Sequence, residues 1–121
     1  MAAVRKTPLN LGVHTSIAGG LVRAVERAES LGCNGFQIFS RNPRGWQPRP
    51  LSRQEAHEFR KSREQAGLWP LAVHALYLIN LAAADPFILH RSREAFREEI
   101  RRSIALGDDE RNLSYVRELG G

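Results

Sequence analysis

A histidine closes a short apolar run in the middle of the chain, and an aromatic and an aliphatic side chain follow it. The run is Leu71-Ala72-Val73-His74, and the pair that follows is Tyr77 and Leu78. An imidazole at the end of a strand has a ring nitrogen available for a metal, and strand ends are where βα folds collect their working residues. Metal sites need three or four donors, so a lone histidine is more often a hydrogen-bonded core residue. His74 is therefore expected to bind a metal only if other ligand side chains lie near it.

Two other segments carry residue types of the same kind. His14 ends another apolar run near the start of the chain, and a turn of small residues follows it. The apolar run at 36–40 opens into a basic, aromatic loop that contains Arg41, Arg44 and Trp46. Because the planar guanidinium matches the geometry of phosphate oxygens, this loop predicts contacts to a polyanion. Trp46 could stack on a ligand or cover the end of the sheet, and coverage is the commoner role for such a tryptophan.

Helical and extended patterns alternate along the chain and would position these residues. Apolar residues recur at helical spacing in three segments, and short apolar runs separate them. We expect helices over 19–31, 52–66 and 85–106, with strands that end near His14, over 36–40 and over 71–74. This βαβαβα order predicts a parallel sheet, as part of a barrel or as a small doubly wound domain.

The third predicted helix combines apolar and charged residues. Phe96, Ile100 and Ile104 recur every four residues and are expected to form its buried stripe. Its arginines and glutamates lie three or four residues apart, which is typical of a solvated face with little meaning for ligands. These residues are Arg91, Arg93, Arg97, Arg101, Arg102, Glu94, Glu98 and Glu99.

Composition limits the classes of function. The chain has 121 residues, 42% hydrophobic residues and a formal net charge of +5, which indicate a folded protein and allow a polyanionic partner. Cys33 is the single cysteine, so neither a disulfide framework nor a thiolate metal cluster is expected. No segment reads as a membrane span or a secretory signal, and we expect a cytoplasmic location without a membrane partner. Glycine-rich phosphate loops and nucleophile motifs are also missing from the sequence.

The order and spacing of the three segments resemble the N-terminal part of the endonuclease IV family. The resemblance runs from about Leu11 to Gly107, and its most specific piece is Tyr77-Leu78-Ile79-Asn80-Leu81 with His74 just before it. Members of this family are zinc-dependent endonucleases of base-excision repair, built on a TIM barrel. They cut duplex DNA 5′ to abasic sites with three zinc ions. The resemblance therefore implies an α/β fold that comprises the first three βα units of a (β/α)8 barrel.

The same resemblance assigns roles to individual residues. His74 matches one of the zinc-ligand positions of the family. Arg44, Tyr77 and Leu78 match positions whose side chains enter the minor groove at the lesion, whereas without the resemblance Tyr77 and Leu78 would read as a capped loop packed on the barrel rim. From their positions and not from the resemblance, His14, Arg41 and Trp46 are expected to support the metal site or to contact phosphates, together with Arg49 and Arg53. No catalytic residue is assigned, because the other ligands belong to later strands.

The end of the sequence departs from the family. A complete barrel needs roughly 200 residues or more, so this chain is expected to be incomplete. After Gly107 a family member would enter a fourth strand that ends in a zinc-binding histidine, but here the polar run at 108–112 cannot form a central strand. We expect a truncated or frame-shifted chain that is inactive alone. The predicted domains are an N-terminal extension at 1–9, a partial TIM-barrel domain at 10–107 and a divergent tail at 108–121.

Three functional hypotheses remain at this stage. The first is an endonuclease IV-like phosphodiesterase. The second is a non-catalytic remnant that binds DNA without cutting it, and the third is a fragment of a sugar isomerase or epimerase with a related barrel. In every case an incomplete parallel sheet has an open edge, which predicts self-association.

Overall fold

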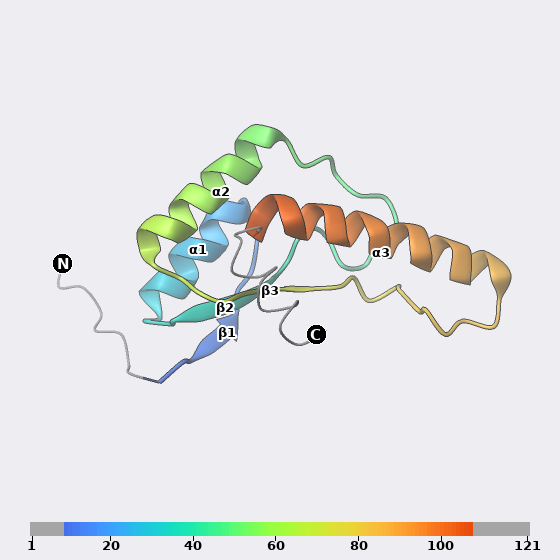
Figure 1. Ribbon diagram of the computed structural model, residues 1–121, viewed down its shortest axis with the longest axis horizontal. Coiled ribbons are helices and arrows are strands. Elements are labelled where there is room, and N and C mark those ends of the chain that lie inside the picture. Colours follow the sequence, from blue (N-terminus) through green and yellow to red (C-terminus); the bar gives the residue numbers. More distant parts are fainter. Residues whose placement is uncertain (1–8, 108–121) are drawn as a thin grey trace, which may run out of the picture.

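The computed structural model describes residues 9–107, which form three βα units (Figure 1). The predicted βαβαβα order is confirmed. In chain order the elements are β1 (Gly12–His14), α1 (Leu21–Ser30), β2 (Gly35–Phe39), α2 (Arg53–Ala66), β3 (Leu71–His74) and α3 (Pro86–Gly107). Except for Leu9, the predicted N-terminal extension lies outside the described residues, as does the whole predicted tail at 108–121, and the domain boundaries remain predictions.

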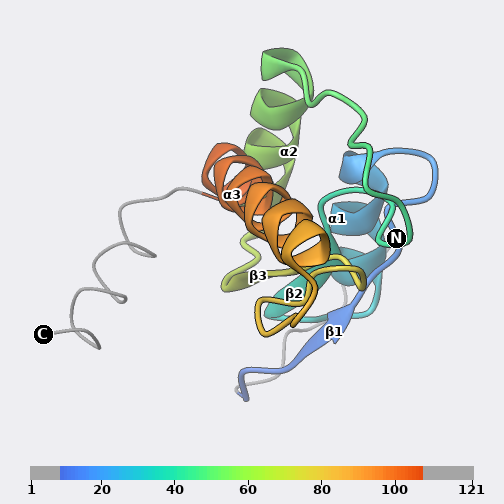
Figure 2. The ribbon, with the colours of Figure 1, turned by 90° about the vertical axis from the view of Figure 1, so that its right-hand side faces the viewer.

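The three strands form one parallel sheet in the order β1-β2-β3. All three helices lie on the same face of this sheet, as the two perpendicular views show (Figures 1 and 2). The opposite face carries no helix among residues 9–107. A hollow of about 390 Å³ opens there, lined by residues that include Leu11, His14, Gln37 and Ala72.

The hydrophobic core lies between the sheet and the helices. Phe36 and Ile38 of β2 are buried against α1 and α2, because alternate residues of a strand point to the same face. The ring of Phe36 lies 6.1 Å from the ring of Phe59 on α2. Val25 on α1 and Leu106 at the end of α3 complete the same cluster.

Local sequence signals fix both ends of α2. The hydroxyl of Ser52 accepts from the backbone N–H of Glu55, and the Glu55 carboxylate accepts in return from the N–H of Ser52, so the predicted capping box is confirmed. Gly67 ends the helix in the left-handed conformation at φ 64°, which a glycine adopts without strain.

The expectation for α3 is wrong about which face is buried. Phe96, Ile100 and Ile104 are 39%, 46% and 49% exposed. The buried face instead includes Ala95, Leu106 and the two charged residues Glu99 and Arg102, so these two do not belong to a solvated face. The reason is tertiary, because Glu99 and Arg102 find polar partners at the end of β2. No helix among residues 9–107 has the length and apolar character needed to cross a lipid bilayer.

Candidate nucleic-acid interface at the strand ends

Four aromatic rings gather where the three strands end. Phe39 lies at the centre, with ring centroids 4.7 Å from His14, 4.9 Å from His74 and 5.2 Å from Tyr77. The parallel register produces this cluster, because it pairs His14 with Gln37 and Phe39 with His74. Phe39 was not singled out from the sequence, although its place at the end of a predicted strand was a usable signal.

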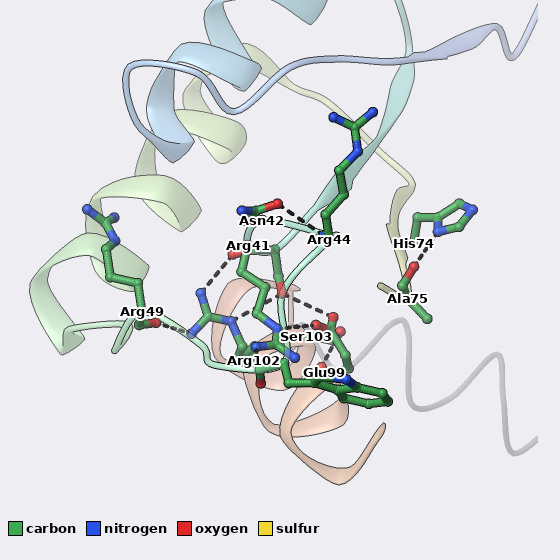
Figure 3. A network of polar contacts seen from close by, with 11 residues as sticks. Arg41, Asn42, Arg44, Arg49, His74, Ala75, Glu99, Arg102 and Ser103 are labelled. Atoms are coloured by element: carbon green, nitrogen blue, oxygen red, sulfur yellow. Dashed lines mark hydrogen bonds and ion pairs between the residues drawn. The ribbon is translucent and has the colours of Figure 1, made fainter. Parts of the chain in front are cut away.

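His74 is held by its own neighbouring backbone. Its Nδ1 lies 2.6 Å from the carbonyl oxygen of Ala75 (Figure 3). Because a carbonyl can only accept, Nδ1 carries the proton and donates it. The neutral ring then keeps a lone pair on Nε2, the arrangement that a metal-binding histidine uses. The predicted ligand therefore has suitable geometry for one bond to a metal.

His14 is fixed differently. Gln37 Nε2 lies 2.9 Å from His14 Nδ1, so the amide donates to that nitrogen and the ring proton of the neutral form lies on Nε2. The His14 and His74 ring centroids are 6.5 Å apart. His14 therefore lies beside His74 at this edge, and its role in supporting the site stays a prediction.

Two loops that are distant in sequence are joined at this edge. The backbone N–H of Tyr77 donates to the carbonyl of Pro43 at 2.9 Å, and the N–H of Arg44 donates to Asn42 Oδ1 at 3.0 Å. Tyr77 is 60% exposed, and Arg44 extends away from the buried polar contacts (Figure 3). Leu78 is partly buried. The structure therefore brings Arg44, Tyr77 and Leu78 to neighbouring loops.

The loop that carries Tyr77 is anchored to the protein on both sides. Leu76 is 3% exposed, and the N–H of Asn80 donates to the buried hydroxyl of Ser92 on α3 at 2.9 Å. An exposed aromatic side chain on an anchored loop loses little conformational freedom when it binds.

Arg41 lies in the interior, and its side chain does not reach the outer surface on which Arg44 lies. Its side chain is 3% exposed, and its Nε donates to Glu99 Oε1 at 3.0 Å. Its Nη1 donates to the carbonyl of Trp46 at 3.2 Å. The guanidinium carbon of Arg91 on α3 lies over the Trp46 ring, 4.8 Å from its centroid. One face of this ring is therefore covered by a side chain of α3. Arg41 is buried because Glu99 supplies the opposite charge.

Arg102 belongs to the same buried network, although its spacing in the sequence predicted a solvated position. It donates to the Ser40 hydroxyl at 3.1 Å, to the Ser40 carbonyl at 2.7 Å and to the Arg49 carbonyl at 2.8 Å (Figure 3). The Ser40 hydroxyl in turn donates to Glu99 Oε2 at 3.1 Å. Burial lowers the pKa of Arg102, and the Glu99 carboxylate opposes that effect.

The described residues do not fit a zinc cluster. Among residues 9–107, no group of three histidine, cysteine, aspartate or glutamate side chains converges on a point. His74 can supply one ligand, whereas a zinc site needs three or four. We therefore derive no reaction step through zinc.

Comparison with known proteins decides the family. The model of the xylose isomerase-like TIM barrel family matches residues 25–118. This chain belongs to that family. A probable endonuclease 4 from Methanosphaerula palustris is 48% identical over 98 residues, which cover 81% of this chain and 34% of the relative. A probable endonuclease 4 from Halorhodospira halophila is 43% identical over 97 residues, which cover 80% of this chain and 33% of the relative.

A solved structure agrees with these relatives. The crystal structure of endonuclease IV from Thermus thermophilus superposes with a TM-score of 0.74 and 41% identity, over 78% of this chain and 36% of that chain. The predicted resemblance to the N-terminal portion of endonuclease IV is thereby confirmed. So is the fold class, the first three βα units of an incomplete TIM barrel. The chain spans about a third of the length of the curated relatives that it matches.

Proposed function

We propose that this chain is part of an endonuclease IV-like DNA repair phosphodiesterase, which cuts duplex DNA 5′ to abasic sites. We also propose that the 121-residue chain alone binds such DNA without cutting it. The similarity to probable endonuclease 4 proteins supports the first statement. The second rests on residues 9–107, in which no two further metal-binding side chains lie close enough to His74 to complete a zinc site.

The observation that carries the proposal is the hydrogen bond from the N–H of Tyr77 to the carbonyl of Pro43. It joins the arginine loop to the tyrosine loop, so that Arg44, Tyr77 and Leu78 can meet one ligand together. These are the three residues to which the resemblance to endonuclease IV assigns a role in DNA binding.

The chemistry of the three side chains suits a damaged duplex. An exposed ring and an aliphatic side chain can replace the base stacking that is lost at an abasic site. The Arg44 guanidinium adds attraction to the phosphate backbone and releases counterions when it binds. Because the Tyr77 loop is anchored through Leu76 and Asn80, it can present its ring without first ordering itself.

We further propose that copies of the chain associate with one another. Among residues 9–107, β1 and β3 each have one neighbouring strand and therefore one open edge. Phe96, Ile100 and Ile104 add an exposed apolar stripe on α3, which water solvates poorly.

The deciding experiment measures binding and incision on the same DNA. Fluorescence anisotropy compares a duplex that holds one abasic site with the intact duplex, and gel electrophoresis follows incision with added zinc or with EDTA. We expect binding that weakens with salt and favours the abasic duplex, with no product. Incision that EDTA stops and that His74→Ala abolishes would refute the statement that the chain does not cut. Failure to bind either duplex would refute the DNA proposal, and binding of a small sugar in its place would support the isomerase-like alternative.

A further inference from the structure

A cavity of about 590 Å³ lies beside the buried arginine network, between the start of α1 and the loop that follows β2. Its walls include Gly19, Gly20, Leu21, Arg41, Arg49 and Arg102. We propose that this cavity binds a phosphate oxyanion. The proposal stands independently of the DNA function argued above, because it rests on a different set of side chains.

One wall of the cavity is a helix start without a side-chain cap. Gly20 is the N-cap of the 10-residue helix α1, no side chain accepts from the first turn, and the first turn holds no acidic residue. The first amides of a helix have no partner within the helix, and the helix dipole makes this end attractive to anions.

The glycines keep the space in front of this helix start open. Gly19 and Gly20 have φ values of 85° and 122°, which L side chains rarely adopt. A Cβ atom added to Gly20 would meet no atom within 4 Å. A ligand can therefore approach the backbone here without a side chain in the way.

The other walls carry three arginines, Arg41, Arg49 and Arg102, and one carboxylate, that of Glu55. Arg41 and Arg102 are both buried and share the single carboxylate of Glu99, through a direct ion pair to Arg41 and through Ser40 to Arg102. Arg41 Nη2 is buried without a hydrogen-bond partner among the described residues. Two buried guanidinium groups that share one buried carboxylate leave an excess of positive charge beside the cavity, which an anion bound there would offset. Burial also lowers the pKa of Arg102, which is the direction expected for an under-compensated cation.

Arg49 lies at the rim of the cavity, and its side chain is the most suitable one to substitute in a test of phosphate binding. Its side chain is 74% exposed and pairs with Glu55 at 2.7 Å, whereas its backbone carbonyl accepts from Arg102 (Figure 3). Substitution of the side chain therefore leaves the buried network in place. Tetrahedral oxyanions with several acceptor oxygens match an arginine fork on one side and helix amides on the other.

The test uses the full 121-residue chain, labelled with ¹⁵N and titrated with inorganic phosphate at constant ionic strength, with sodium chloride as the reference. We expect saturable shifts of the Gly19 and Gly20 amide signals and a phosphate-dependent rise in Tm. Arg49→Gln should weaken phosphate binding about fivefold, and Arg49→Lys should restore part of it. Arg97→Gln, which also removes an exposed arginine that pairs with a glutamate, should bind as the parent does.

Three results would overturn the proposal. They are the absence of saturable shifts at Gly19 and Gly20, shifts equal to those caused by chloride, and equal affinities of Arg49→Gln and Arg97→Gln for phosphate. A second titration with an intact DNA duplex identifies the source of the phosphate. Shifts of the same amides, with weaker duplex binding by Arg49→Gln than by Arg97→Gln, would assign the cavity to a backbone phosphate of DNA. Shifts with inorganic phosphate alone would assign it to a small phosphate compound.

Discussion

The Glu99 carboxylate on α3 accepts a hydrogen bond from Arg41 Nε at 3.0 Å, although the two residues are 58 positions apart in the sequence. Their side chains are 6% and 3% exposed, so the ion pair is almost completely removed from water. This ion pair holds α3 against the segment that follows β2, and the loop with Arg44 begins there. The position of that loop consequently depends on Glu99, which has no contact with DNA in the proposed function.

Removal of the Glu99 charge should destabilise the fold strongly. Glu99→Gln leaves the buried guanidinium of Arg41 without a counter-charge, and such a loss costs about 3 kcal/mol. The free energy of unfolding, measured by urea denaturation, checks this value. Glu94→Gln is the matched control, because Glu94 forms an exposed pair with Arg97, and it should cost less than about 1 kcal/mol. Equal losses in the two variants would contradict the structural role of Glu99.

Arg44 should contribute to DNA binding mainly through charge. We expect Arg44→Ala to weaken duplex binding about fivefold and to reduce the slope of log K against log salt by about one. Anisotropy titrations at several sodium chloride concentrations measure both quantities. Arg97→Ala removes an exposed charge from α3 and should leave the slope nearly unchanged. A common slope for the two variants would show that Arg44 makes no phosphate contact.

Tyr77 should determine preference for the lesion more than overall affinity. Tyr77→Ala removes the ring that would replace the missing base, and we expect the ratio of affinities for abasic and intact duplex to fall about tenfold. Phe87→Ala is the control, since Phe87 is 64% exposed and Tyr77 is 60% exposed. Competition binding with the two duplexes gives the ratio directly. If both variants keep the parent's ratio of affinities for abasic and intact duplex, the Tyr77 ring does not replace the missing base.

The apolar stripe of α3 should drive self-association. Ile100 is 46% exposed at the centre of this stripe, and Ile100→Lys should shift sedimentation velocity profiles toward the monomer because it places a charge in the proposed contact. Leu31→Lys tests a residue that is 65% exposed at the end of α1 and should change nothing. A parent chain that sediments as a monomer at every concentration would refute the proposed association.

Most of the secondary structure could be predicted from local patterns. The limits of α2 follow from Ser52, Glu55 and Gly67, whose roles as caps depend only on neighbouring backbone groups. The meeting of His14, His74 and Tyr77 at one edge also follows, because parallel strands all end on the same side of a sheet.

Local patterns were sufficient to predict the order of the elements, and the resemblance was sufficient to predict the family. His14, His74 and Tyr77 were expected at the shared edge, but Phe39 between them was not. The buried face of α3 and the burial of individual arginines depend instead on contacts between distant segments. Spacing cannot distinguish an exposed Arg101 from a buried Arg102, because both belong to the same charged pattern. The difference arises from partners such as Ser40, which lies 62 residues away from Arg102 in the sequence and beside it in the fold. Burial of a charge depends on such distant partners, and local sequence does not contain them.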